Sequence, residues 1–444
     1  MKQMKRMLCL LLLLAMLTGC AGNGKNTANT DGVVDNGAVD TGSEEVQTPP
    51  EAVPIPEPEP EPEPEPVVST LAICGDVMSH LPLTNDTWNG ERYDFHRVMA
   101  AAEPYVSAAD CAVANFETTM AGGPNYSGYP CFNAPDTLAE DLKTMGFDLV
   151  MTSNNHSMDK GGKGVIRTLN MLDKNGLKHV GTSRTIAEYE NNAVVMDVGG
   201  ISVAFLGYTY GTNGIPLPKN APYAANLFNV DYMTTLSTPD EEKLISDLKK
   251  AEELGADMIA VMIHWGVEYQ TKPNAYQQRL ADLLIQNGAD IILGGHSHVL
   301  QSMEMRSVAM PDGTTAERFV SYSLGNFISS QNQRLTDVTA VLTVEMTKDP
   351  KTGETTVTDY YYQPMLMLDR EGGQGRFELL DVYAEIAKGD QANASQSKLQ
   401  QTLEDAHAIL GAEYDVVWRA ENASGAYTED AAAETGADGS GAAA

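Results

Sequence analysis

Short runs of apolar residues, each ending at a polar side chain, recur through the middle of this chain. Residues 67–74 form an apolar run rich in β-branched side chains that ends in Gly75-Asp76. Residues 257–263 form a similar run that ends at His264. Runs of this length and composition are typical of buried β-strands. The same pattern predicts strands at residues 108–115, 147–152 and 290–293.

Between these runs, apolar residues are spaced as on one face of a helix. Residues 164–174 show this spacing and are followed by Asn175-Gly176. A glycine, or Asn-Gly, after the last periodic residue commonly ends a helix. The same reasoning predicts helices at residues 136–145, 239–254 and 274–286.

The order of these elements predicts a layered α/β fold. Strand and helix alternate, which is typical of sheets covered by helices. Gly199-Gly200 lies between apolar runs at residues 193–198 and 201–207, and this arrangement predicts a β-hairpin. Later in the chain the pattern changes to strands alone. We expect these strands to form the second sheet of a sandwich, at residues 318–322, 338–346 and 355–362.

The first 20 residues have the pattern of an export signal. Three basic residues precede an apolar run at residues 7–17, which is too short to cross a bilayer comfortably. The run ends in Leu17-Thr18-Gly19-Cys20, which resembles the lipobox of bacterial lipoproteins. Two acyl chains on Cys20 would anchor the protein stably, so we expect it on the extracellular face of the cell membrane. An ordinary signal peptide with an incidental cysteine is the alternative.

Composition divides the chain into four parts. Residues 1–19 are the predicted signal peptide, and residues 20–67 contain almost no large hydrophobic side chains. The second part cannot bury enough apolar surface to fold, and its Pro-Glu repeat favours a stiff, extended spacer. Residues 68–420 contain the predicted globular domain. Residues 421–444, rich in Ala, Gly, Glu and Asp, are predicted to be a disordered tail.

A large negative charge limits the partners of this protein. Acidic residues number 61 and basic residues 29, which gives a formal net charge of −32. Removal of the signal peptide takes away three positive charges and no acidic residue, so the charge changes from −32 to −35. We therefore expect no nucleic-acid partner. An anionic polymer would also be repelled, unless a bound cation or a local basic groove intervenes.

The five cysteines form no CxxC pair, so neither a zinc ribbon nor a thioredoxin-like site is indicated. Burial as small hydrophobic side chains is the simpler interpretation for Cys74 and Cys111. The sequence leaves open whether Cys111 and Cys131 pair.

Ligand-type side chains stand at the ends of five predicted strands. Sites in α/β folds gather beyond the carboxyl ends of strands, so we expect these side chains to meet. One histidine after an apolar strand is usually a buried structural residue, but packing does not explain six such positions. Mixed carboxylate, amide and imidazole donors suit Mn, Fe or Zn better than Ca. The six residues are Asp76, Glu117, Asn155, His264, His296 and His298.

Six short motifs contain or flank these residues. In chain order they are Gly75-Asp76, Asn115-Phe116-Glu117, Asn154-Asn155-His156-Ser157-Met158-Asp159, His264-Trp265-Gly266-Val267-Glu268-Tyr269, Gly295-His296-Ser297-His298 and Ser323-Leu324-Gly325-Asn326-Phe327. Together they resemble the CapA family, also called the poly-γ-glutamate biosynthesis protein family, over roughly residues 70–330. That family is related to the calcineurin-like metallophosphoesterases. The resemblance implies a four-layer α/β/β/α metallophosphatase-like sandwich.

The resemblance also implies a role for each ligand-type residue. In the metallophosphoesterases a strand-end aspartate binds the first metal, which matches Asp76, and a second carboxylate bridges two metals, which matches Glu117. The amide at Asn155 would bind the second metal and orient a phosphate. Its neighbour His156 would be the catalytic residue that protonates the leaving oxygen. The remaining imidazole ligands match His264, His296 and His298.

This sequence departs from the metallophosphoesterase pattern at two motifs. The first motif, Asp-x-His in that superfamily, has Met78 in place of the histidine. A thioether is a poor ligand for hard divalent ions. The second motif replaces the usual pair of aspartates with Asn115-Phe116-Glu117. His80 is a candidate substitute for the missing imidazole. The sequence therefore leaves open whether one or two ions bind.

Other residues near the motifs are candidates for substrate contact. Glu268 and Tyr269 follow His264 closely, and Asn326 lies on a glycine-containing loop after a strand. We expect these three residues to line the site. Asp159 is expected to fix the turn that follows His156.

Three functions fit these observations. The resemblance implies a role in the synthesis, export or anchoring of an anionic capsule polymer such as poly-γ-glutamate, in partnership with membrane proteins of polymer synthesis or export. The ligand set also fits a metal-dependent surface phosphoesterase. A non-catalytic scaffold of the same fold is the third hypothesis, since fold alone does not fix function.

Overall fold

The computed structural model describes residues 64–370, 372 and 375–422, and these belong to one structural unit. The predicted signal peptide, Cys20, most of the tether and all but two residues of the predicted tail lie outside the described residues. Within the described part, no helix is both long enough and apolar enough to cross a bilayer.

The first sheet joins strands from the start of the domain to strands from its end. Its parallel strands are β1 (Val67–Val77), β2 (Cys111–Phe116), β3 (Leu149–Met151) and β4 (Lys178–Val180). Its antiparallel strands are β12 (Val338–Lys348), β13 (Thr355–Asp369) and β14 (Phe377–Asp381). The strand order is β14-β13-β12-β1-β2-β3-β4, and the short β11 (Asn326–Ile328) pairs with the end of β1.

The second sheet has the strand order β5-β6-β7-β8-β10-β9. Its strands are β5 (Val194–Val198), β6 (Ile201–Thr209), β7 (Met258–His264), β8 (Ile291–Gly295), β9 (Met303–Ala309) and β10 (Thr315–Ser321). The predicted hairpin is confirmed as β5 and β6, which pair antiparallel. Gly199 and Gly200 have φ angles of 60° and 100° at this turn, a conformation that favours glycine.

Both faces of the first sheet are buried, as β1 shows. Leu71 and Ile73 point into the apolar core between the two sheets. Ala72 and Cys74, which alternate with them, point into the core beneath the helices. Burial on both faces explains why the strand is a continuous apolar run and does not alternate with polar residues.

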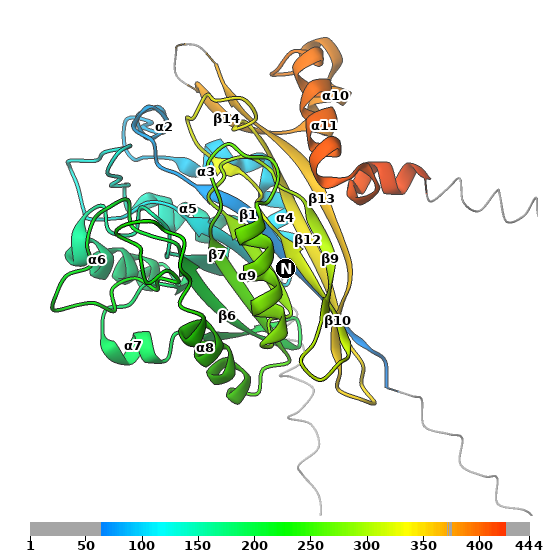
Figure 1. Cartoon of the computed structure of the whole chain (residues 1–444). Helices are drawn as coiled ribbons and strands as arrows, with labels where there is room; N and C mark the ends of the chain where they lie inside the picture. The colour runs from blue at the N-terminus through cyan, green and yellow to red at the C-terminus, as the bar shows by residue number, and fades with distance from the viewer. Residues whose placement is uncertain (1–63, 371, 373–374, 423–444) are drawn as a thin grey trace, which may run out of the picture. The chain divides into compact units, whose positions relative to one another are not determined.

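Helices cover the outer face of each sheet. The first sheet is covered by helices that include α5 (Thr137–Met145) and α6 (Gly161–Lys174). The second is covered by α8 (Glu241–Glu253) and α9 (Ala275–Gln286). The ribbon shows this layering (Figure 1). The predicted four-layer α/β/β/α sandwich is therefore confirmed.

The expected membership of the second sheet was wrong. Of the three late strands, only the one at residues 318–322 lies in it, as part of β10. The strands at residues 338–346 and 355–362 are parts of β12 and β13, which extend the first sheet (Figure 1). The physical reason is the open edge of β1, whose residues from Val67 to Ile73 pair antiparallel with β12.

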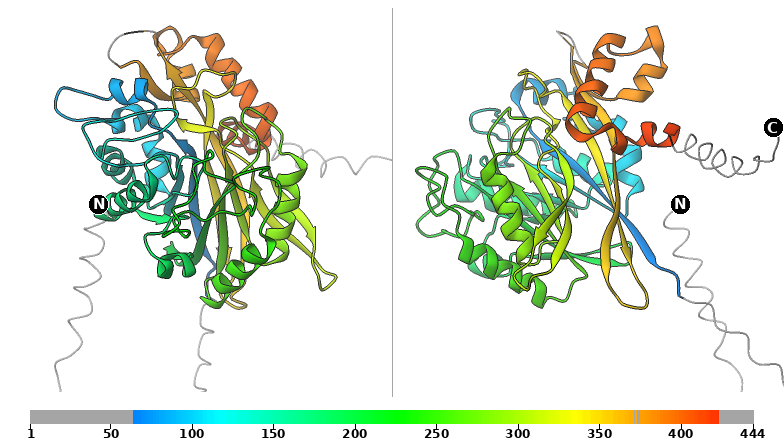
Figure 2. Two further views of the ribbon diagram at one scale, coloured as in Figure 1. Left: turned by 60° about the vertical axis from the view of Figure 1, so that its left-hand side comes forward. Right: turned by 45° about the vertical axis from the view of Figure 1, so that its right-hand side comes forward.

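Several helices were not predicted from the sequence. Three helices lie between β1 and β2, and because the last ends at Ala108, β2 starts at Cys111 and not at residue 108. Two further helices follow β14 and pack near β13 (Figure 2). These five helices are α2 (Leu81–Asp86), α3 (Phe95–Met99), α4 (Glu103–Ala108), α10 (Val382–Ala387) and α11 (Gln396–Leu410).

The cysteines of the described residues are unpaired. Cys74 and Cys111 are buried and Cys131 is partly buried, and all three are free thiols. The pairing of Cys111 with Cys131 that the sequence left open is therefore absent from this structure.

Candidate metal centre

The predicted ligands lie at the carboxyl ends of strands from both sheets. In the first sheet, Asp76 lies beside Asn115 in the parallel pair of β1 and β2. In the second, His264 at the end of β7 lies beside Gly295 at the end of β8, and His296 follows directly. Strands of a parallel pair end at the same edge, so the polar residues that follow them meet at one end of the sandwich.

Short distances join the ligands across the two sheets. Nδ1 of His298 lies 3.2 Å from Oδ2 of Asp76, and Nε2 of His298 lies 3.9 Å from Oε1 of Glu117. Nε2 of His264 lies 3.6 Å from the same oxygen of Glu117 and 3.1 Å from Oδ1 of Asn155. All five side chains are at most 2% exposed. The structure therefore brings these predicted ligands into one buried cluster.

Two groups of ligand atoms are spaced closely enough to hold an ion. In each group, three residues offer one ligand atom apiece, and these atoms lie within 4.8 Å of one another. The first group consists of Asp76, Glu117 and His264. The second consists of Glu268, His296 and His298.

Two atoms of the cluster are buried without a hydrogen-bond partner. They are Oε1 of Glu117 and Nδ1 of His296. A buried polar atom without a partner costs about 1–3 kcal/mol, so two of them in one cluster indicate a missing partner. Carboxylate oxygen and imidazole nitrogen both donate lone pairs to cations. The residues present therefore fit a divalent ion.

The electrostatics of the cluster agree with that fit. Burial, with added repulsion from Asp76 and Glu268, raises the pKa of Glu117 well above its ordinary value. Burial, with added repulsion from neighbouring histidines, lowers the pKa of His264 and of His296 well below the ordinary value. Neutral imidazole is the form that binds metals, and a cation would relieve the repulsion between the carboxylates.

A single amide holds the two buried carboxylates. Nδ2 of Asn115 donates to Oδ1 of Asp76 at 2.7 Å and to Oε2 of Glu117 at 3.2 Å. Nδ2 of Asn154 in turn donates to Oδ1 of Asn115 at 3.1 Å. Outer partners of this kind fix the orientation of metal ligands.

His156 lies beside the cluster and is held by Asp159. Nδ1 of His156 lies 2.8 Å from Oδ2 of Asp159, and its Nε2 lies 3.4 Å from Nδ2 of Asn213. Phe132 packs edge-on against the imidazole at 4.6 Å between ring centroids. A hydrogen bond from Nδ1–H to Asp159 leaves Nε2 as the atom available for proton transfer.

The cluster opens into a cavity of about 350 Å³. The backbone N–H of Tyr269 donates to the carbonyl oxygen of Ser297 at 2.7 Å, which ties the loop after β7 to the loop after β8. Burial, with the adjacent Glu268, raises the pKa of Tyr269 to about 12, so its phenol stays protonated. The lining side chains include Met78, His80, Tyr129, His156, Glu268, Tyr269 and His298.

Two candidate residues have contacts that the sequence did not suggest. Asn326 is fully buried beside Asp76, and its Oδ1 lies 3.1 Å from Nδ1 of His298. We infer that Asn326 orients His298. Nδ1 of His80 contacts Ser329 and Ser330, at 3.3 Å and 3.4 Å, and His80 belongs to neither group of ligand atoms.

Sequence reasoning missed Tyr210 and Asn213. The ring of Tyr210 lies 4.6 Å from that of His296 and stacks on that of His264 at 6.2 Å. Asn213 contacts His156, as described above. Tyr210 directly follows β6, so the rule that strand ends supply site residues could have found it. No local signal marks Asn213, which reaches the site from an irregular loop.

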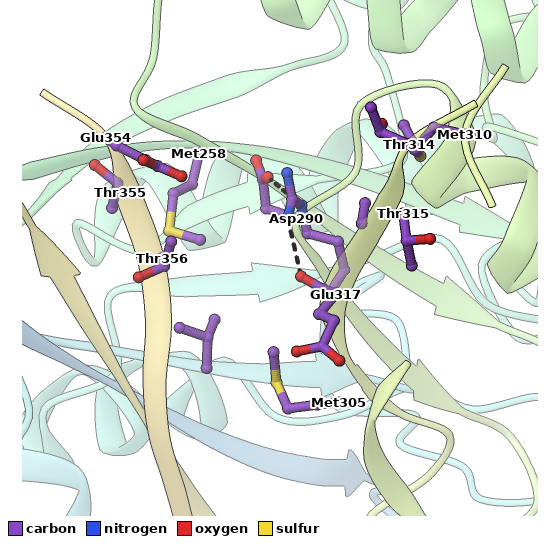
Figure 3. Close-up of a pocket in the computed structure, with 13 residues that line it drawn as sticks. Met258, Asp290, Met305, Met310, Thr314, Thr315, Glu317, Glu354, Thr355 and Thr356 are labelled. Carbon is purple, nitrogen blue, oxygen red and sulfur yellow. Dashed lines mark hydrogen bonds and ion pairs between the residues drawn. The ribbon is translucent and has the colours of Figure 1, made fainter. Parts of the chain in front are cut away.

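Another cavity, of about 470 Å³, lies at the opposite end of β7 and β8 (Figure 3). Its lining includes Met258 at the start of β7 and Asp290, which forms an ion pair with Arg318 at 2.9 Å. No histidine or cysteine lines this cavity. We therefore place the chemistry of the protein at the histidine-rich end.

Solved structures with related folds include two proteins of phosphate chemistry. A novel phosphatase from Mycoplasma pneumoniae has a TM-score of 0.39 and 13% identity, covering 67% of this chain and 94% of that one. The calcineurin-like phosphoesterase YfkN from Bacillus subtilis has a TM-score of 0.38 and 12% identity, covering 78% of this chain and 98% of that one. Likenesses at this level carry no argument about activity.

Two proteins found by sequence are more similar to this chain than these solved structures are. The capsule biosynthesis protein CapA of Bacillus anthracis is 29% identical over 279 residues, which is 62% of each chain. The PGA biosynthesis protein CapA of Bacillus subtilis (strain 168) is 30% identical over 286 residues, which is 64% of this chain and 69% of that one. The match thus spans less than two thirds of the Bacillus anthracis protein. Residues 70–331 match the family described as bacterial capsule synthesis protein PGA_cap, and the chain belongs to that family.

Proposed function

We propose that this chain acts in capsule biosynthesis as a metal-dependent protein that processes an anionic polymer such as poly-γ-glutamate. Family membership and the names of the two Bacillus relatives support the capsule role. The observation that carries the chemistry is the buried ligand cluster, with two partnerless ligand atoms, opening into a cavity beside His156.

The residues that would hold an ion come from both sheets. Asp76, Glu117 and His264 form one group, with the amide oxygen of Asn155 next to His264. A divalent ion held there supplies Lewis-acid charge at the bond under attack and a local positive field for an anionic substrate. Such a field would offset the repulsion between an anionic polymer and a protein whose net charge is −32.

His156 is placed to move a proton at the mouth of this cluster. It lines the cavity while Asp159 holds its Nδ1. This pairing orients the imidazole and fixes which of its nitrogens carries the proton. Nε2 can then deliver a proton to the leaving group of the substrate, which is the work of a general acid.

The space beside the cluster favours a polymer over a small ester as the substrate. A neighbouring cavity of about 450 Å³ shares His80, Tyr129 and Ser330 with the cavity at the cluster, so the two are adjacent. Lys160 lines the neighbouring cavity and forms no ion pair with any described residue. The second cavity thus offers room for a further unit of a chain and a cation for its acidic group.

A second candidate function is hydrolysis of a phosphoester. The pairing of an amide ligand, Asn155, with the adjacent His156 favours it, because together they can orient a phosphate and protonate its leaving oxygen. A non-catalytic scaffold would need neither the ion nor His156.

The test compares the full-length protein with its His156→Asn variant. We expect the wild type, loaded with Mn²⁺, Fe²⁺ or Zn²⁺, to shorten poly-γ-glutamate, as measured by size-exclusion chromatography. The variant should be slower by about 100-fold or more, the usual contribution of a general acid. His179→Asn is the matched control, because His179 lies on β4 and pairs with Asp173 outside the cluster.

Other outcomes separate the alternatives. Release of p-nitrophenol from bis(p-nitrophenyl) phosphate without polymer shortening would favour the phosphoesterase. Absence of both reactions in a folded protein, with or without bound metal, would favour the scaffold. Equal rates for wild type and His156→Asn would contradict the role of His156.

We also propose that a lipid on Cys20 holds the protein on the extracellular face of the membrane. The lipobox-like sequence supports this location, and the Pro-Glu repeat in residues 20–67 supports a spacer between membrane and domain. Membrane proteins of polymer synthesis or export are the partners that such a location offers.

A further inference from the structure

Two cavities on the first sheet's side of the molecule are lined without any carboxylate. One is the cavity of about 450 Å³ that Lys160 lines, here named the Lys160 cavity. The other has about 310 Å³ and is lined by Lys163, and it is named the Lys163 cavity. Acidic residues outnumber basic ones by 61 to 29 in this chain. The cavity at the opposite end of β7 and β8, by contrast, is lined by Asp290, Glu317 and Glu354 (Figure 3).

The lysines of these two cavities are available to an anionic ligand. Neither Lys160 nor Lys163 forms an ion pair with any described residue. Arg184 also lines the Lys163 cavity, but it already pairs with Asp173 and Glu188. The two lysines therefore give these cavities a positive lining on a strongly negative protein. Such local complementarity selects a partner of opposite charge.

The two cavities lie in sequence with the cavity at the ligand cluster. The Lys160 cavity shares three lining residues with the cluster cavity, and Tyr129 is one of them. Lys160 directly precedes α6, and Lys163 lies in the first turn of that helix. The start of α6 therefore separates the Lys160 cavity from the Lys163 cavity. We call these two cavities together the anion track.

Exposed apolar side chains accompany the cations along this track. Tyr129 is 75% exposed, and its ring lies 6.4 Å from that of His156. Ile166 is 43% exposed and lines the Lys163 cavity. Covering apolar surface gains about 25 cal/mol for each Å² removed from water. A ligand with both aliphatic groups and carboxylates would thus be held by apolar contact and by the lysines at once.

We propose that the anion track binds the units of a linear polycarboxylate that flank the bond at the metal centre. Lys160 pairs with the carboxylate of the nearer unit, and Lys163 pairs with that of a unit further along the chain. Poly-γ-glutamate has this chemistry, because each unit carries one carboxylate on an aliphatic backbone. The inference rests on the proposed function and deepens it. It supplies the local basic groove that an anionic polymer needs on a protein of net charge −32.

The experiment measures binding and not activity. Full-length protein is stripped of metal with a chelator, and its affinity for labelled poly-γ-glutamate is measured by fluorescence anisotropy at about 0.15 M salt, which screens long-range repulsion. We expect Lys160→Gln and Lys163→Gln each to weaken binding by about 3-fold to 5-fold, and the double variant by about 10-fold or more. Lys160→Arg should bind like the wild type. Lys249→Gln is the matched control, because it removes the same charge from an exposed lysine on α8.

A second pair of variants tests the apolar contact. Tyr129→Ala should weaken binding, whereas Tyr129→Phe should keep it, since the ring and not the hydroxyl meets the aliphatic part of the ligand. Tyr129 is exposed, so neither substitution disturbs the core. Thermal melting verifies that each variant is folded. Equal binding by Tyr129→Ala and the wild type would overturn the part of the proposal that concerns this ring.

The outcomes separate the anion track from the proposed function. Equal affinity of the double lysine variant and Lys249→Gln would overturn the track, and so would absence of binding by the wild type. Polymer shortening by the metal-loaded protein would still support the proposed function in either case. Lysine-dependent binding without shortening would support the track and overturn polymer processing. Tighter binding of linear polyphosphate than of poly-γ-glutamate would overturn the assignment to a polycarboxylate.

Discussion

At the scale of single residues, the site depends on side chains that hold the ligands as much as on the ligands. The strand-end pattern named Asp76, Glu117 and His264 because each follows an apolar run, and the structure brings them together. The strand-end pattern did not reveal that the side-chain amide of Asn115 donates hydrogen bonds to both carboxylates. Such a role depends on distances between strands, which no local pattern contains.

Asn115→Ala should weaken metal binding without changing any ligand. The substitution removes the donor shared by Asp76 and Glu117, so the two carboxylates lose their fixed orientation. Loss of an outer partner typically weakens metal affinity by about 10–100-fold. Titration with Mn²⁺ followed by calorimetry measures the change. Asn191→Ala, at an exposed helix end, is the control, and equal affinity in the two variants would contradict the role of Asn115.

At the scale of elements, the sequence predicted most of the long strands and helices. As expected, α5 lies between Asp136 at its N-terminal end and Gly146 at its C-terminal end. Asn274 caps α9 through its side chain. Most of the missed helices are short, although α11 has 15 residues. A helix such as α2 gives too few residues for a spacing to be recognised, and its position depends on distant contacts. Asp86 at its end accepts backbone hydrogen bonds from Gly375, Arg376 and Phe377, ahead of and within β14.

Asp86 should make the stability of the domain depend on pH in the acidic range. Burial acts to raise the pKa of Asp86, but backbone donors at Phe377 and Arg376 and the side chain of Arg97 outweigh it, so the pKa lies below its ordinary value of 3.8. A lowered pKa contributes stability above the unfolded value, and that contribution is lost as the pH falls through the folded value. The loss should therefore occur below about pH 4.

Asp86→Asn tests this contribution. The variant should be less stable at neutral pH by about 1–3 kcal/mol, because it weakens charged hydrogen bonds. The difference from wild type should shrink as the pH falls below about 4, where Asp86 itself becomes protonated. Urea unfolding followed by circular dichroism measures both effects. Asp390→Asn, at an exposed aspartate, should match the wild type throughout, and a difference that is constant with pH would contradict the prediction.

At the scale of the whole molecule, the two sheets could not be assigned from the sequence. β12 and β13 were expected in the second sheet, yet they continue the first because the edge of β1 accepts β12. Pairing between residues far apart in the chain decides which sheet a strand joins. The sequence of an apolar run does not show which strand it pairs with. The location of the protein, by contrast, is predicted from residues outside the described domain.

Cys20→Ser should release the protein from the membrane. Without the thiol no lipid can be attached, and a Pro-Glu-rich segment has no apolar surface to hold it there. We expect the variant in the soluble fraction or the medium and the wild type in the membrane fraction, compared by cell fractionation and immunoblotting. Cys131→Ser is the matched control, since Cys131 is a free thiol within the domain. Membrane-bound Cys20→Ser would contradict the anchor.

The sequence by itself determined the layered α/β class, the family resemblance and the set of ligand-type residues. These follow from local apolar runs and from side chains at fixed places beside them. Only the tertiary structure decided which sheet each late strand joins, that Asn326 is buried behind His298, and that Glu268 lies with His296 and His298. Those facts depend on contacts between distant segments, which form only when the two sheets pack and bring their strand ends together.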